Sequence, residues 1–420
     1  MTHTLAGLLL AEAVIGLCRE KGHPLSAGAR TALRVGSALA NNLNDADFLY
    51  ARHWAGKLGY LLNHRGHTHT LPAAFALGLV VFALVSLTAR FASGLRLSAR
   101  ERWHLLLVCM LGPFVHIGMD FSNNYGVHPF WPFDSHWYYG DTLFIIEPWL
   151  WVFAVPPLCG LVESRVLRAL LVLICGFVLI LGWVHPMVHW GTALLLSLGT
   201  VGAWRLTGRL SALRRLAFAG AGWVLVALGF VVGTRGVRVA AASLSSAQAT
   251  ARGFDEHIVD VVVTPTPANP LCASALVVAT RDEQTYLVRA ASVSLAPWLV
   301  TPEGCHVEPT GFTAGLRRAG FASSESVRWD GEWQGSLSEL RSLNQGNCWA
   351  SAMFRFARVP FWEVRRGGVL VLGDIRYDRL PGEGFAEVHA RQRPAECPKG
   401  VPGWNPPRED LLDLRRLRWW

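Results

Sequence analysis

The sequence predicts an α-helical polytopic membrane protein of about eight transmembrane helices, followed by a C-terminal β-rich (α+β) extracytoplasmic domain. Of its 420 residues, 51% are hydrophobic and only 16% are charged, and the mean hydropathy is +0.29. Apolar runs recur up to Gly233, after which the composition becomes polar. Such a balance is too apolar for an ordinary soluble enzyme of this length.

Apolar runs of about twenty residues cross the hydrocarbon core as helices, because a helix satisfies its own backbone hydrogen bonds there. The clearest runs are residues 71–88, 143–162, 166–184, 187–204 and 216–233. Three weaker runs are short or interrupted by polar residues: 5–17, 31–43 and 103–119. The first run has neither a basic leader nor a small-residue cleavage site, so we expect it to be retained.

Basic residues divide unequally between alternate loops. Fourteen Lys and Arg residues lie in the loops at 19–34, 90–102, 165–168 and 205–215. The loops between them contain only Arg52, Lys57 and Arg65. Because cytoplasmic loops carry the excess of positive charge, we expect both termini and the C-terminal domain outside the cytoplasm. The net charge of +9 therefore reflects topology, and no nucleic-acid partner is expected.

The chain is predicted to divide into residues 1–239 and 240–420, with a Ser/Ala-rich linker at 240–251. Runs of β-branched or alternating residues at 257–263, 275–279 and 369–372 predict strands, and residues 264–267 predict a turn. Four dispersed cysteines outside the cytoplasm would form two disulfides in one of three pairings, or remain as buried free thiols. These are Cys272, Cys305, Cys348 and Cys397.

Five polar clusters lie within the first 150 residues, and the predicted topology brings all of them to the same membrane face. They are His3, Asp45 with Asp47, residues 64–69 (His-Arg-Gly-His-Thr-His), His116 with Asp120, and Asp141. A single histidine at a membrane interface is usually a satisfied or snorkelling side chain. Five clusters together indicate a shared site, because ionisable groups near the hydrocarbon are costly.

Imidazole and carboxylate groups are the usual ligands of zinc, and of manganese or iron where oxygen donors dominate. His116 and Asp120 are four residues apart, so they share one face of a helix. An aspartate pair spaced like Asp45 and Asp47 can bridge two ions or divide into a ligand and its support. We expect a divalent metal, zinc first, held by His3, Asp45, Asp47, His64, His69, His116 and Asp120.

A bound divalent ion lowers the pKa of its water and polarises a substrate oxygen, so this cluster predicts a metal-dependent hydrolase. Arg65 is the candidate partner of an anionic substrate group, with an ordinary interfacial arginine as the alternative. His67 or Asp141 is the candidate general base. A metal or ion transporter and a non-catalytic membrane scaffold are the other classes of function that remain. The sequence contains no His-Glu-x-x-His motif and no Walker loop, which weighs against a zinc protease and ATP-driven transport.

The order of these motifs resembles the YdjM-like family of LexA-regulated, inner-membrane-associated metal-dependent hydrolases. The resemblance is carried by His3, residues 42–47 (Asn-Leu-Asn-Asp-Ala-Asp), residues 64–69, His116 with Asp120, and the segments 131–133, 140–149, 269–271 and 373–377. Asn44 stands where the family has proline, and Glu147 where aspartate is more usual. The resemblance implies a multi-pass inner-membrane protein with a divalent metal, whose partner is membrane lipid or a small-molecule or lipid-linked substrate. A more distant similarity to helical zinc-dependent phospholipases C and related nucleases implies phosphoester cleavage.

Overall fold

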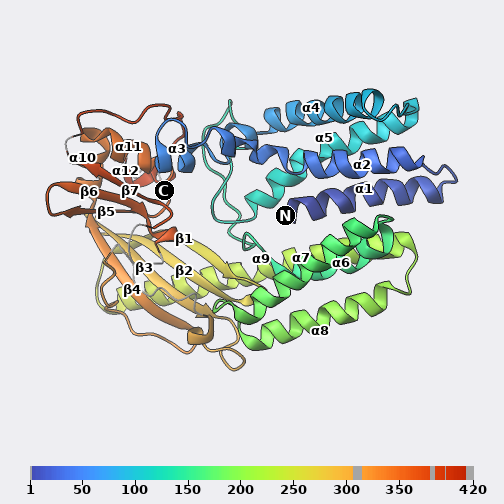
Figure 1. Cartoon of the computed structure of the whole chain (residues 1–420). Helices are drawn as coiled ribbons and strands as arrows, with labels where there is room; N and C mark the ends of the chain where they lie inside the picture. The colour runs from blue at the N-terminus through green and yellow to red at the C-terminus, as the bar shows by residue number, and fades with distance from the viewer. Residues whose placement is uncertain (1, 306–314, 379–383, 393, 413–420) are drawn as a thin grey trace.

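Helices fill one half of the molecule and two β-sheets fill the other (Figure 1). The computed structural model describes residues 2–305, 315–378, 384–392 and 394–412. The α-helices of the first 251 residues are α1 (Thr2–Glu20), α2 (Ala27–Ala40), α3 (Gly56–Asn63), α4 (Leu71–Phe91), α5 (Ala99–Phe121), α6 (Pro148–Leu161), α7 (Arg165–Val184), α8 (Trp190–Thr207) and α9 (Ala212–Ala251). Two 3-10 helices carry polar motifs: η1 (Leu43–Leu49) and η2 (His67–His69).

Polar caps fix where several of these helices begin. The side chains of Ser26, Thr70, Ser98 and Ser164 each accept a hydrogen bond from the backbone N–H three residues further on. This bond satisfies one of the free N–H groups at a helix N-terminus. The apolar runs therefore begin at defined residues, and the polar motifs before them have fixed positions.

Within the described part of the chain, five helices are long and apolar enough to cross a membrane, namely α1, α4, α5, α7 and α9. Helix α6 is a shorter apolar helix, while α2 has 14 residues and α8 has 18. Each predicted run overlaps one of these eight helices, but the run expected from residue 143 becomes helical only at Pro148. The side chain of Glu147 caps that helix. Proline is favoured at the first helical position, because a backbone N–H there would have no hydrogen-bond partner within the helix.

These eight helices pack as two groups. Helices α1, α2, α4 and α5 form the first group and α6, α7, α8 and α9 the second, and α1 also packs against α6 and α9. The arginine-rich loops lie at the end of the helices remote from the sheets (Figure 1). The segments η1 and η2 lie at the opposite end, beside the sheets.

Helix α9 is a single helix of 40 residues, so the linker predicted at 240–251 is wrong. Alanine has the highest helix propensity, and its small side chain lets a sheet pack closely against the helix. Val237, Ala241 and Ala249 are buried with strand residues in one hydrophobic cluster. At Gly233 the helix and the sheet approach closely, because an added Cβ would lie 1.9 Å from the carbonyl oxygen of Pro270.

Two antiparallel sheets form the C-terminal body. The strands β1 (Glu256–Thr266), β2 (Asn269–Arg281), β3 (Thr285–Ser294) and β4 (Val327–Ser336) pair in sequence order, as do β5 (Pro360–Arg365), β6 (Val369–Asp374) and β7 (Glu387–Arg391). The short helices are α10 (Leu337–Gly346), α11 (Cys348–Phe354), α12 (Glu409–Leu412), η3 (Pro302–Cys305) and η4 (Ile375–Tyr377). The predicted strands are confirmed, although β1 continues to Thr266 and the turn is only Pro267 and Ala268.

Disulfides join Cys272 to Cys305 and Cys348 to Cys397. This selects one of the three pairings that the sequence allowed. The other cysteines of the chain are buried and free: Cys18, Cys109, Cys159 and Cys175.

The predicted boundary at residues 239 and 240 does not separate two independent cores. Leu58, Leu61 and Leu62 of α3 are buried in the same hydrophobic cluster as Phe361 of β5. Trp404 reinforces this packing, since its Nε1 donates a hydrogen bond to the carbonyl oxygen of Leu62 at 2.6 Å. An eight-residue helix is too short to be stable alone, so α3 depends on the C-terminal body for its packing.

Candidate metal centre

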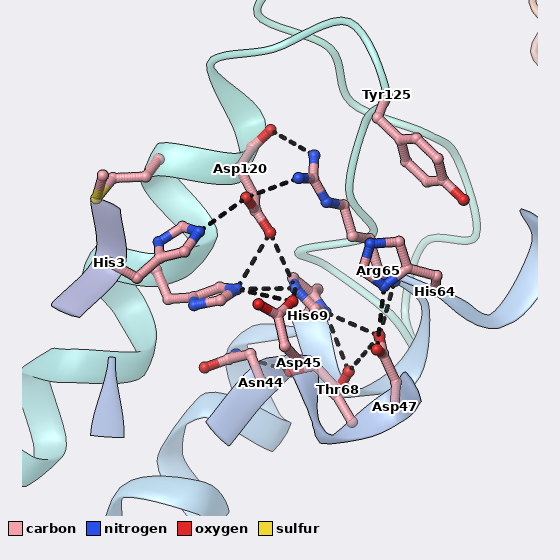
Figure 2. Close-up of polar contacts among 12 residues, drawn as sticks. His3, Asn44, Asp45, Asp47, His64, Arg65, Thr68, His69, Asp120 and Tyr125 are labelled. Atoms are coloured by element: carbon pink, nitrogen blue, oxygen red, sulfur yellow. Dashed lines mark hydrogen bonds and ion pairs between the residues drawn. The ribbon is translucent and has the colours of Figure 1, made fainter. Parts of the chain in front are cut away.

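Two imidazoles and two carboxylates converge among the polar side chains drawn in Figure 2. His116 and Asp120 come from α5, Asp45 from η1 and His69 from η2. The Oδ2 atom of Asp120 lies 3.0 Å from His69 Nε2 and 3.1 Å from His116 Nε2. The Oδ1 atom of Asp45 lies 3.6 Å and 3.5 Å from the same two nitrogens, which are 3.1 Å apart.

These separations fit a cation that is bound by four ligand atoms in a tetrahedral arrangement. Zinc binds nitrogen and carboxylate oxygen at about 2.0–2.2 Å, which places neighbouring ligand atoms of a tetrahedron about 3.3–3.6 Å apart. The separations given above, 3.0–3.6 Å, are close to that range. Imidazole and carboxylate ligands bind zinc and also manganese or iron. The four residues therefore fit one divalent ion.

The outward-facing nitrogens of both histidines are fixed by hydrogen bonds. His116 Nδ1 bonds to the carbonyl oxygen of Asn41 at 2.8 Å, which requires a proton on that nitrogen. His69 Nδ1 lies 3.0 Å from Thr68 Oγ1, and that hydroxyl donates to Asp47 Oδ2 at 3.1 Å. In the neutral tautomers that these bonds select, both Nε2 atoms carry the lone pair that a metal ion would accept. Such partners are the usual way to orient a metal-binding histidine.

Asp120 divides its two oxygens between different roles. Its Oδ1 pairs with Arg65 Nη2 at 2.9 Å and with His3 Nε2 at 3.3 Å. Its Oδ2 is buried and makes no hydrogen bond of normal geometry with the residues described. An unsatisfied carboxylate oxygen is costly. A cation among the four converging atoms would stabilise it.

Asp47 is not one of the four converging residues, but it contacts the residues next to them. Its Oδ2 accepts a hydrogen bond from the backbone N–H of Arg65 at 2.8 Å, and its Oδ1 bonds to His64 Nδ1 at 3.1 Å. One oxygen from each of Asp45 and Asp47 and one nitrogen of His64 are also close enough to form a second group of possible ligands. Asn44, which replaces the family proline, donates to the carbonyl oxygen of Thr68 at 2.9 Å. This bond ties η1 to η2.

The charges around these side chains shift their protonation. Burial alone would raise the pKa of Asp47, but hydrogen bonds from His64 and His69 lower it to about 2. For Asp45 the bonds from His116 and His69 likewise outweigh burial and lower its pKa. Burial alone would lower the pKa of His69, but the neighbouring carboxylates of Asp120, Asp45 and Asp47 raise it to about 10. The clustered carboxylates thus favour a positive charge among them, which a proton or a metal ion supplies.

The seven predicted ligands all lie in this region, but at different distances from its centre. Asp45, His69, His116 and Asp120 form the converging set. His3 packs its ring against His116, with centroids 3.8 Å apart, and supports Asp120 from the side. His64 and Asp47 lie at the opposite side, next to Asp45.

The three predicted catalytic residues lie in three different settings. Arg65 lines the cavity described below, and its guanidinium bonds to Asp120 and to Asn123 Oδ1. His67 packs against Trp131 and Trp404. Asp141 is buried in ion pairs with Arg358 at 2.8 Å and Arg238 at 2.9 Å, and it therefore joins the helical half to the C-terminal body.

The metal centre borders a cavity of about 1030 Å³. Its lining includes His3, Asp45, His64, Arg65 and Asp120, together with apolar residues of α5, α6 and α9. The C-terminal body adds Tyr377 and Phe385. Tyr377 belongs to the segment 373–377 that carries part of the family resemblance, whereas sequence reasoning missed Phe385 and also Asn41, because nothing in the sequence links those two to the histidine motifs.

A further histidine, His128, lies outside the converging set. Its side chain is buried and stacks on Trp404 with centroids 3.8 Å apart. Burial lowers the pKa of His128 to about 3, so the ring is neutral near pH 7.

The fold and the site define an integral membrane protein with a candidate metal centre at one end of its helices. Residues 1–191 match the family described as "YdjM inner membrane protein", which confirms the family resemblance for this part of the chain. The match includes every candidate ligand and ends at the start of α8, so the similar segments at 269–271 and 373–377 lie outside it.

A stretch of 93 residues is also 28% identical to the "Uncharacterized protein YfhP" of Bacillus subtilis (strain 168). This stretch covers 22% of the chain and 26% of that relative, so the chain spans about a quarter of the relative's length. No solved structure matches the chain.

Proposed function

We propose that this protein is a membrane-bound metal-dependent hydrolase that acts on a phosphoester or lipid-linked substrate at the outer face of the inner membrane. The observation that carries the proposal is the convergence of Asp45, His69, His116 and Asp120 beside a large cavity. Zinc is the metal that this donor set fits best.

A divalent ion at this site supplies Lewis acidity, which lowers the pKa of water and polarises a substrate oxygen. Asp45 is the most exposed of the four ligands and lines the cavity, so substrate approaches the site on its side. His64 also lines the cavity, and Asp47 bonds to its Nδ1. Because Asp47 holds its Nδ1, His64 would present Nε2 to the cavity as the general base, in place of the base expected at His67 or Asp141. Arg65 keeps Asp120 oriented and ionised.

Two observations support the proposed location of the metal centre at the outer face of the membrane. The arginine-rich loops lie at the end of the bundle remote from the metal centre, as expected for cytoplasmic loops. The C-terminal body contains two disulfides, which persist in oxidising compartments outside the cytoplasm.

The alternative as a metal or ion transporter requires polar groups along a path through the bundle. Among the described residues that line the cavity, the charged ones lie at the end near the sheets. The lining contributed by α6 and α9 is apolar: Leu150, Trp151, Trp223 and Ala227. This distribution favours a site at one membrane face.

Metal analysis of the purified protein tests the proposal. Wild type should retain a divalent ion, whereas His69→Ala and Asp120→Ala should lose it together with hydrolysis of a phosphodiester lipid in mixed micelles. His23→Ala, in the exposed loop after α1, is the matched control and should retain both. Unchanged metal content in both site variants would overturn the proposal.

A further inference from the structure

The cavity beside the metal centre lies between the two groups of helices, with walls from α1, α5, α6 and α9. We propose that it holds the apolar chain of a lipid, which enters from the bilayer between α5 and α6 and places its polar group at the metal centre. The identity of this lipid as the substrate rests on the proposed function, whereas binding of its chain does not.

The depth of the cavity supports this proposal. Trp223 and Ala227 of α9 line it, and the same helix meets the sheet at Gly233. The ten residues from Gly233 to Trp223 span about 15 Å at about 1.5 Å per residue. This is half of a hydrocarbon core about 30 Å thick. The cavity therefore reaches from the level of the sheets to about the middle of the bilayer.

The lining changes character along this depth. Its charged members belong to or adjoin the metal centre: His3, Asp45, His64, Arg65 and Asp120. Its members from the membrane helices α6 and α9 are apolar. A water-soluble substrate would gain little binding free energy from an apolar space of this size. An amphiphile fits both parts of the cavity, because its polar group suits the charged end and its apolar chain suits the end lined by α6 and α9.

The segment at 143–146 marks the route of access. Ile145 is 56% exposed and Ile146 is 42% exposed, and both also line the cavity. Helix α5 packs on α2 and α4, whereas α6 packs on α7, α8 and α9, so this irregular segment bridges the two groups. Backbone outside a helix is tolerated at membrane depth where it lines a cavity. The exposed isoleucines therefore form an apolar rim facing the lipid.

Two cavity-filling substitutions test the proposal. Gly118 of α5 lines the cavity, and a Cβ added there has no atom within 4 Å, so Gly118→Leu extends into open space. Ala227→Leu adds apolar volume from the wall formed by α9. Gly176→Leu is the matched control, because a Cβ at Gly176 of α7 also has no atom within 4 Å but this residue does not line the cavity.

Binding of a pyrene-labelled phosphatidylglycerol, presented in detergent micelles, is followed by fluorescence. Both cavity variants should bind the probe at least tenfold more weakly than the wild type does. Their metal content and unfolding temperature should equal those of the wild type. Gly176→Leu should bind the probe as the wild type does. Wild-type binding by both cavity variants would overturn the proposal. A large fall in the unfolding temperature of both would also overturn it, because the space would then not be open.

The metal-site variant His69→Ala separates this inference from the proposed function. It should lose the metal and still bind the probe. If His69→Ala keeps the metal while Gly118→Leu loses the probe, the hydrolase proposal fails and the lipid-chain site stands.

Discussion

Replacing Asp47 by asparagine should weaken metal binding without abolishing it. Oδ2 of Asp47 accepts hydrogen bonds from the backbone N–H of Arg65 and from Thr68 Oγ1, and Oδ1 bonds to His64. Asparagine keeps the size of the side chain but replaces one oxygen by a donor, so at least one of these bonds is lost. The Thr68 hydroxyl is then less firmly oriented toward His69 Nδ1.

Loss of such an outer carboxylate reduces metal affinity by about 10–100-fold, which corresponds to about 1.4–2.7 kcal/mol. Loss of a ligand, as in His69→Ala, should cost more. Competition for zinc between the purified protein and a chromophoric chelator measures both affinities. Wild-type affinity in Asp47→Asn would refute the positioning role. A loss as large as that of His69→Ala would show that Asp47 is itself a ligand.

Three further predictions concern stability. Arg358→Met leaves buried Asp141 and Asp260 without a shared partner and should cost roughly 3–5 kcal/mol in thermal unfolding, whereas Arg365→Met breaks an exposed pair and should cost about 1 kcal/mol or less. Because the pKa of His128 falls to about 3 on folding, the unfolded chain binds the extra proton below about pH 6.5. The free energy of unfolding should therefore fall by up to about 1.4 kcal/mol per pH unit between about pH 6.5 and pH 3. In His128→Phe this contribution to the pH dependence should be absent when unfolding is measured at several pH values. The disulfides close loops with sequence separations of 33 and 49 residues, so reducing either should destabilise the C-terminal body by about 4 kcal/mol, measurable as a lower unfolding temperature.

Much of the candidate site could be predicted because membrane topology restricts where polar residues lie. Once alternate loops are assigned to opposite faces, residues at the ends of successive helices must meet at one face. His116 and Asp120 follow directly, since their four-residue spacing places both on one side of α5. His69 and Asp45 follow from the same topology, although only the structure shows that their ligand atoms reach the same point.

The roles of the charged residues were harder to predict, because each depends on partners distant in sequence. Asp141 pairs with Arg358, which is 217 residues away, and no local pattern identifies that partner. Arg65 looks like an anion-binding residue in isolation, but Asp120 already occupies its guanidinium. The linker prediction failed because a Ser/Ala-rich composition suits both a flexible segment and a helix packed on a sheet.

The continuity of α9 has a mechanical consequence. One end of this 40-residue helix forms part of the cavity wall at Trp223, and the other is buried against the sheet at Ala241 and Ala249. At about 1.5 Å per residue the helix is roughly 60 Å long, and it contains no proline that would act as a hinge. Any tilt of the C-terminal body relative to the bilayer is therefore transmitted along this rod and alters the width of the space beside the histidines.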